Sequence, residues 1–117
     1  MAVRRVVPNV FDRDPAKTRD FYTSVFELDV AMDIGWISTV ASPTNATAQI
    51  SIVSEDGEQG RDPFISIEVD DVDAVHAQAV ELGHEVVYEL RDEPWGVRRF
   101  MLKDPAGRTV NVLSHPT

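Results

Sequence analysis

The side chain in this sequence best suited to acid–base chemistry is the carboxylate of Glu68. Glu68 lies between Ile67 and Val69 in a strand-like run, so alternation points it to the face opposite theirs. A partly buried carboxylate needs a cationic partner, and Arg5 or Arg99 could supply one, as could a cationic ligand. Glu68 could also act as a general base, although the sequence offers no evident general acid beside it.

Amide and aromatic side chains extend this set of candidate contact residues. Gln49 and Asn111 carry donors and acceptors that can orient a bound molecule. Trp95 follows a proline between two predicted strands, where its ring could form a pocket wall or hold the hairpin together. Trp36 could offer an aromatic face to a planar or cationic ligand, and packing in the core is an equal alternative. Of the adjacent arginines 98 and 99, one points to each face of its strand, so at most one reaches the ligand.

Other kinds of catalytic chemistry have little support in the sequence. The chain contains no cysteine, which excludes a thiol nucleophile and thiolate metal ligands. His76 is predicted on a helix flank, His84 at a strand start and His115 in the terminal tail. None is predicted to share a cavity wall with a carboxylate, so we expect surface or boundary positions. We therefore predict neither a metal nor another cofactor.

The elements that must position these residues follow the order strand, helix and three strands, twice along the chain. In the first pass Asp14 is predicted to cap a helix that begins at Pro15 and carries Phe21, Tyr22, Val25 and Phe26 on one side. The strands of this pass are predicted at 3–10, 29–34, 36–41 and 47–54.

The second pass follows a polar linker predicted at 55–63. Its helix is predicted over 71–82, with Gly83 as the stop signal, and its strands over 64–69, 84–90, 97–103 and 108–114. The last two strands are joined by the turn Asp104-Pro105-Ala106-Gly107. This pattern predicts an α+β fold in a single domain, 1–117, with βαβββ modules at about 1–57 and 62–117. One module cannot cover both faces of its own sheet, so the modules should pair, within one chain or across a homodimer.

Length and charge restrict the partners. A formal charge of −9 over 117 residues argues against nucleic acid, which requires a basic face. The same charge favours a cationic ligand, or serves solubility alone. The sequence shows no membrane span and no signal peptide, so the expected location is cytoplasmic.

With these motifs in place, the chain resembles the vicinal oxygen chelate superfamily. That group includes glyoxalase I, the extradiol dioxygenases, fosfomycin-resistance enzymes and bleomycin-resistance proteins. The resemblance rests on the paired modules, on Val69-Asp70-Asp71-Val72 before the second helix, and on Pro94-Trp95-Gly96 followed by the turn at 104–107. It is closest to the bleomycin-resistance branch. It implies an open, cleft-containing mixed β-sheet half-barrel.

In metal-dependent members of this superfamily, four strands each supply one metal ligand. The resemblance places these positions on Val7, Phe64, Asn111 and either Gln49 or Ser51. Valine and phenylalanine have no lone pair to donate, and neutral amide oxygens compensate a divalent charge poorly. The resemblance therefore implies a protein without the usual metal, in which Phe64 makes the cleft more apolar.

These arguments give one leading hypothesis and one alternative. The leading hypothesis is a metal-free, homodimeric protein that sequesters a small molecule, such as a cationic or aromatic antibiotic-like ligand. The predicted ligand contacts are Trp36, Gln49, Phe64, Glu68, Trp95, Arg99 and Asn111. The alternative is a metal-independent isomerase or lyase with Glu68 as its general base.

Overall fold

The computed structural model describes residues 2–54 and 63–116, and these form two compact units. The N-terminal unit comprises Val7–Asp62, and the C-terminal unit comprises Pro63–Thr117 together with Met1–Val6. The predicted linker at 55–63 lies outside the described residues, apart from Pro63. Strand β1 (Val3–Phe11) begins in one unit and ends in the other.

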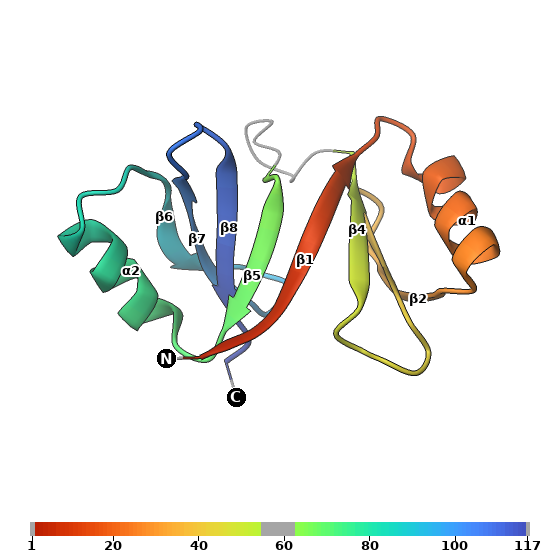
Figure 1. Ribbon diagram of the computed structural model, residues 1–117, viewed down its shortest axis with the longest axis horizontal. Coiled ribbons are helices and arrows are strands. Elements are labelled where there is room, and N and C mark those ends of the chain that lie inside the picture. Colours follow the sequence, from red (N-terminus) through yellow and green to blue (C-terminus); the bar gives the residue numbers. More distant parts are fainter. Residues whose placement is uncertain (1, 55–62, 117) are drawn as a thin grey trace. The chain divides into compact units, whose positions relative to one another are not determined.

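The predicted α+β class and the two βαβββ modules are confirmed by the order of the elements (Figure 1). After β1, the first module continues with α1 (Pro15–Phe26), β2 (Asp29–Asp33), β3 (Ile37–Ala41) and β4 (Gln49–Val53). The second module consists of β5 (Ile65–Val69), α2 (Val72–Glu81), β6 (Val86–Asp92), β7 (Arg98–Lys103) and β8 (Thr109–Ser114).

Both modules have the same strand topology. In the N-terminal unit β1 pairs parallel with β4, and β4–β3 and β3–β2 pair antiparallel. In the C-terminal unit β5 pairs parallel with β8, and β8–β7 and β7–β6 pair antiparallel. The two halves of the chain thus build the same four-stranded arrangement.

Helix α2 packs on one face of its sheet as its sequence predicts (Figure 1). The Asp71 side chain caps it by accepting a hydrogen bond of 3.1 Å from the Ala74 amide. Gly83 follows the helix with φ of 81°, a conformation that favours glycine. The core beneath the helix contains Val69, Val72, Ala79, Phe100 and Val112.

Helix α1 differs from its prediction in two ways. Asp14 occupies the N-cap position before Pro15 but its side chain makes no capping hydrogen bond. The nearby Asp12 carboxylate accepts a hydrogen bond of 2.9 Å from the Asp14 amide and another from the Thr18 hydroxyl, and neither donor is a backbone amide of the first helical turn. The helix also buries no residue completely, and Phe26 remains 58% exposed.

The turn between β7 and β8 forms as predicted. Asp104 Oδ1 accepts hydrogen bonds of 2.9 Å from the amides of both Ala106 and Arg108, and Gly107 adopts φ of 83°. No helix within the described ranges is long and apolar enough to cross a bilayer.

Candidate functional site

Strand register brings four of the predicted contact residues onto one face of the C-terminal sheet. Val110 and Val112 of β8 pack toward α2, so Asn111 points to the opposite face. In adjacent strands Ser66 pairs with Asn111, and Glu68 pairs with Leu113. We call this surface, opposite α2, the polar face; it carries Phe64, Ser66, Glu68, Arg99, Met101, Asn111 and Leu113.

Glu68 is held by two cationic or potentially cationic partners. Arg5 donates through Nε to one carboxylate oxygen, and His115 Nδ1 lies 2.8 Å from the other. Of the two candidate partners named from the sequence, Arg5 is therefore the one that pairs with Glu68. Burial disfavours the charged form of Glu68, but the hydrogen bonds from His115 and Arg5 outweigh it and lower its pKa.

This contact corrects the expectation for His115. The sequence placed His115 in a terminal tail without a carboxylate partner, whereas the structure places it directly beside Glu68. β8 runs parallel to β5, so the residue that follows β8 reaches the end of β5 where Glu68 lies. The contact between His115 and Glu68 therefore depends on the parallel pairing of strands about 45 positions apart in the sequence. A local sequence pattern does not reveal this pairing.

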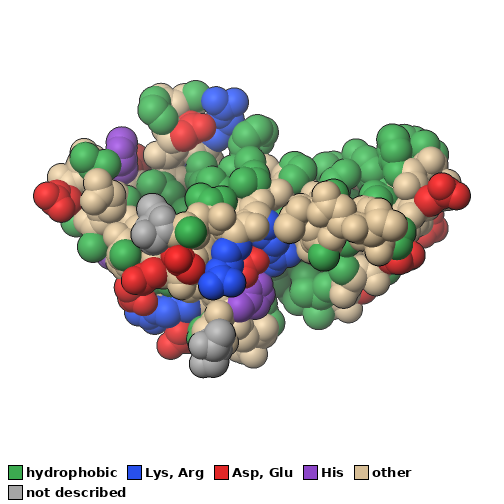
Figure 2. All heavy atoms as spheres, turned by 60° about the horizontal axis from the view of Figure 1, so that its bottom comes forward, with side chains coloured by type: hydrophobic (Ala, Val, Ile, Leu, Met, Phe, Trp, Pro, Cys, Tyr) green, Lys and Arg blue, Asp and Glu red, His purple; other side chains and the backbone are tan. Residues whose placement is uncertain are grey.

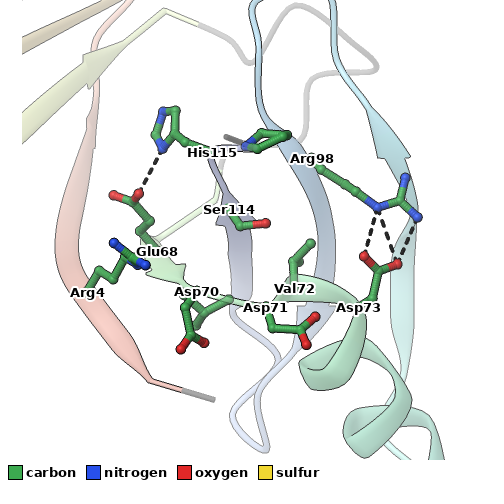
Figure 3. A pocket seen from close by; sticks show the side chains of 11 residues that line it. Arg4, Glu68, Asp70, Asp71, Val72, Asp73, Arg98, Ser114 and His115 are labelled. Atoms are coloured by element: carbon green, nitrogen blue, oxygen red, sulfur yellow. Dashed lines mark hydrogen bonds and ion pairs between the residues drawn. The ribbon is translucent and has the colours of Figure 1, made fainter.

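A pocket of about 470 Å³ opens at the ends of β5 and β8, beside the start of α2 (Figure 3). The Glu68–His115 pair lines one side, and the ion pair between Arg98 and Asp73 lines the other. Figure 2 shows acidic, basic and histidine side chains gathered together on this side of the molecule. The pocket wall is therefore rich in charge, and most of that charge is already paired internally.

Arg99 lies in a second, more deeply buried network. Its Nε donates to Glu93 Oε2 at 2.7 Å, Arg91 Nε donates to Oε1 at 2.8 Å, and the Tyr88 hydroxyl donates to Oε2 at 2.6 Å. Burial disfavours ionised Glu93, but the hydrogen bonds from Tyr88, Arg91 and Arg99 lower its pKa overall. The pKa of Tyr88 is raised by burial and by its hydrogen bond to Glu93.

Trp95 joins this network through its ring. The Arg99 guanidinium lies 5.0 Å from the Trp95 ring centroid and 4.8 Å from that of Tyr88, both within cation–π range. Sequence reasoning selected Trp95 and Arg99 but missed Tyr88 and Glu93. Irregularities in the β6–β7 pairing break the alternation near Tyr88, and a loop carboxylate such as Glu93 gives no periodic signal. The sequence did contain one signal for Glu93: it lies between two strands that carry arginines, and an arginine could pair with its carboxylate.

Asn111 carries the one buried side-chain acceptor that lacks a hydrogen bond among the residues the structure describes. Its Nδ2 donates to Ser66 Oγ at 3.0 Å, while its Oδ1 accepts nothing there. Asn111 is 8% exposed. An unsatisfied buried acceptor reduces the stability of the folded protein by about 1–3 kcal/mol, so a hydrogen-bond donor placed beside Asn111 Oδ1 would be stabilising.

The remaining predicted residues have varied surroundings. Phe64 is 53% exposed, and the Arg108 guanidinium lies 5.2 Å from its ring centroid. In the N-terminal unit, Gln49 Nε2 donates to the Ala46 carbonyl at 2.6 Å, and Trp36 is half-buried. Ser51, the other possible ligand position on β4, shares a buried hydrogen bond of 2.8 Å with Thr39.

The donor set does not fit a divalent metal. Two of the positions implied by the resemblance, Val7 and Phe64, have hydrocarbon side chains, and Asn111 contributes a neutral amide. Among residues 2–54 and 63–116, no three His, Asp or Glu side chains are grouped as a metal site. We therefore derive no chemistry through a metal at these positions.

Comparison with known proteins agrees with the fold. The family described as the Glyoxalase/Bleomycin resistance protein/Dioxygenase superfamily matches residues 4–112, and the chain belongs to this superfamily. A search of curated protein sequences gives no match.

Several solved structures share the fold at low identity. A superfamily member from Vibrio splendidus 12B01 has a TM-score of 0.67 at 14% identity, over 97% of this chain and 99% of that one. A methylmalonyl-CoA epimerase variant from Streptomyces coelicolor, in complex with 2-nitronate-propionyl-CoA, has a TM-score of 0.76 at 16% identity, over 99% and 100%. Methylmalonyl-CoA epimerase from Mycobacterium tuberculosis has a TM-score of 0.69 at 20% identity, over 98% and 88%.

Proposed function

We propose that this chain is a metal-independent small-molecule-binding protein that sequesters its ligand on the polar face of the C-terminal unit. The observation that carries the proposal is the unsatisfied Oδ1 of Asn111. Asn111 stands at a position where the family resemblance implies a metal ligand, and its amide oxygen needs a hydrogen-bond donor. An N–H or O–H group of a ligand would supply one.

The internal pairing of the ionisable groups supports binding over catalysis. Both oxygens of Glu68 are engaged by Arg5 and His115, and its pKa is lowered, which makes it a weak base. Glu93 is likewise ionised and fully paired. The motifs at Trp95 and at the 104–107 turn support the bleomycin-resistance branch as the nearest functional type, with a cationic or aromatic antibiotic-like ligand as one candidate.

A thermal-shift screen of Asn111→Leu against the unaltered protein tests this proposal. The screen uses cationic glycopeptide antibiotics, aromatic acids and amines, and Mn²⁺, Ni²⁺ and Zn²⁺. Leucine is close in size to asparagine. It removes the unsatisfied acceptor and also the hydrogen bond from Nδ2 to Ser66 Oγ, so the variant should melt close to the temperature of the parent. Any organic ligand that stabilises the parent should stabilise Asn111→Leu much less, because binding shifts stability by mass action.

The matched control is Gln78→Leu, an amide-to-leucine change at an exposed position on α2. Gln78→Leu should show the same ligand-induced rise in melting temperature as the parent. If Asn111→Leu keeps the same ligand-induced shift as the parent and Gln78→Leu, the binding role of Asn111 is wrong.

The pairing of Glu68 with His115 favours a second candidate, a metal-independent isomerase or lyase. The carboxylate and imidazole lie 2.8 Å apart and line the same pocket, which is an arrangement that can exchange a proton. Methylmalonyl-CoA epimerases are among the solved structures similar to this chain. For any ligand found in the screen, NMR detection of a product that disappears in Glu68→Gln, with affinity unchanged, would favour the enzyme.

We also propose that the protein is a homodimer. Apolar side chains of α1 are more than half exposed, namely Phe21, Val25 and Phe26, and hydrophobic surface of this kind is visible in Figure 2. Sedimentation equilibrium should give twice the chain mass, and Phe26→Asp should shift it toward the monomer. A monomer at high protein concentration would contradict this.

A further inference from the structure

Ser114, the last residue of β8, places a hydroxyl group on the side of the sheet that faces α2. Val110 and Val112 precede it on that side of the strand and pack toward the helix. Ser114 is only 9% exposed, and its hydroxyl group has no hydrogen bond within residues 2–54 and 63–116. The hydroxyl group points into the pocket at the ends of β5 and β8 (Figure 3). A ligand in the pocket that hydrogen-bonds to this group would therefore be stabilising.

Carboxylates outnumber guanidinium groups around this pocket. Two guanidinium groups line it, from Arg4 and Arg98, against four carboxylates, from Glu68, Asp70, Asp71 and Asp73. Glu68 is paired with Arg5 and His115. Asp73 is paired with Arg98, which donates to both of its carboxylate oxygens. The charge that remains for a ligand therefore depends on the two aspartates between β5 and α2.

These two aspartates differ in how their charge is compensated. Asp70 accepts a hydrogen bond of 2.7 Å from the Ala2 amide, and this bond, together with the charge of Arg4, lowers the pKa of Asp70. Asp71 accepts its hydrogen bond of 3.1 Å from the Ala74 amide through Oδ1, and it forms no ion pair in the part of the chain that the structure describes. Asp71 thus offers a negative charge to a cation in the pocket. Because Asp71 is exposed, this charge alone would bind a cation weakly.

Other ligand classes fit this pocket less well. The start of a helix favours anions, but that of α2 already has the carboxylate of Asp71 at its cap and that of Asp73 in its first turn. A bare divalent metal is disfavoured because no three His, Asp or Glu side chains within the described ranges are grouped as a metal site. A volume of about 470 Å³ suits a small organic molecule.

We propose that this pocket is a second ligand site, which binds the primary ammonium group of a small organic amine through the Asp71 carboxylate and the Ser114 hydroxyl oxygen. An ammonium group carries three N–H donors and can donate to both oxygens, whereas a quaternary ammonium group has none. Ser114 faces α2, whereas Asn111 points to the polar face. The site therefore goes beyond the proposed function and does not depend on it, although Glu68 borders both.

Probes of similar size that differ in charge and in N–H donors test the proposal. Butylamine, 1-butanol, butyrate and tetramethylammonium are each titrated into ¹⁵N-labelled protein at neutral pH and constant ionic strength. The signals followed are the backbone amides of Ala74, which is bonded to Asp71, and of Ser114. We expect saturable shifts with butylamine, and dissociation constants at least about tenfold weaker for the other three probes.

Asp71→Asn and Asp29→Asn separate a specific contact from a general charge effect. Asparagine also caps helices well, so Asp71→Asn removes the charge and keeps the cap. Asp29 is an exposed residue of β2 in the N-terminal unit. Asp71→Asn should weaken butylamine binding about tenfold, whereas Asp29→Asn should leave it within about twofold.

Ser114→Ala tests the hydroxyl group, with Ser24→Ala as its control. Ser24 is an exposed residue of α1 in the N-terminal unit. Ser114→Ala should weaken butylamine binding about fivefold, and Ser24→Ala should leave it within about twofold. The melting temperature of Ser114→Ala should stay close to that of the parent, because the hydroxyl group has no partner to lose among the described residues.

Four results would overturn the inference: butyrate or tetramethylammonium binding as tightly as butylamine, equal weakening by Asp71→Asn and Asp29→Asn, full butylamine affinity in Ser114→Ala, or no saturable shift with butylamine. If one of these occurs while Asn111→Leu still abolishes stabilisation by another ligand, the amine site is wrong and binding on the polar face stands. If butylamine binds through Asp71 and Ser114 while Asn111→Leu affects no ligand, the amine site stands and the role of Asn111 is wrong.

Discussion

Replacement of Glu93 by glutamine should destabilise the protein more than a typical surface change. The Glu93 carboxylate is fully buried and accepts hydrogen bonds from Arg91, Arg99 and Tyr88. Glutamine preserves the shape and one oxygen but removes the negative charge. Arg99, whose side chain is 5% exposed, would then lose the buried carboxylate that accepts from its Nε.

The expected magnitude follows from this geometry. Removal of one partner of a buried ion pair typically costs about 3–5 kcal/mol. Because glutamine retains one acceptor, we expect a loss of about 3 kcal/mol in the free energy of unfolding, at the low end of that range. For a domain of this size the melting temperature should fall by roughly 4 °C or more for each kcal/mol.

Urea unfolding at neutral pH measures this loss, with Glu89→Gln as the control. Glu89 is an exposed residue of β6, the strand that Glu93 follows, so its replacement removes the same charge from the same region and should cost less than about 0.5 kcal/mol. If Glu93→Gln falls within that limit as well, Glu93 does not compensate Arg99 and the network is wrongly described.

The pH dependence gives an independent check with a definite sign. The pKa of Glu93 is lower in the folded protein than in the unfolded chain, so its contribution is complete above the unfolded pKa of about 4.3. That contribution is lost as the pH falls through the folded pKa. The stability difference between the parent and Glu93→Gln should therefore shrink toward pH 3, and a constant difference would contradict the assignment.

Three further predictions concern other contacts. Asp104→Ala should destabilise the protein by about 1–2 kcal/mol in urea unfolding, because Asp104 accepts two backbone hydrogen bonds and pairs with Arg108; an unchanged midpoint would show that the turn forms without it. Gly83→Ala should cost about 1 kcal/mol through its positive φ alone, since no atom lies within 4 Å of an added Cβ, and equal stability would refute backbone strain there. Glu68 should titrate below about pH 4.3 by carbon-detected NMR, and a higher midpoint would favour the general-base alternative.

The sequence predicts the elements of this fold well because the local signals are strong. The alternation around Glu68 in β5, the stop signal of Gly83 after α2 and the Asp-Pro-Ala-Gly turn each have one favoured structure. The prediction for α1 was less accurate: Asp14 occupies the cap position, but Asp12 makes the hydrogen bonds. Both aspartates precede Pro15, and local sequence does not show which one turns toward the helix.

The site was predictable only where alternation determines the face. Asn111 and Glu68 could be assigned in this way, and the strand register agrees. For Arg98 and Arg99, alternation predicted one residue on each face but did not show which one. The contact of His115 with Glu68 depends on parallel pairing between distant strands, and the place of Glu93 depends on irregular pairing of β6. Neither the His115–Glu68 contact nor the position of Glu93 follows from a periodic sequence pattern, so the sequence predicted neither of them.

We propose that this superfamily member binds its ligand without a divalent metal. Equilibrium dialysis against Mn²⁺, Ni²⁺ and Zn²⁺ in excess Mg²⁺, followed by elemental analysis of the protein, measures whether it holds one. We expect no stoichiometric uptake of any of the three ions, with the parent and Asn111→Leu giving the same result. One tightly held ion per chain in the parent, absent from Asn111→Leu, would show that the protein binds a metal at this position.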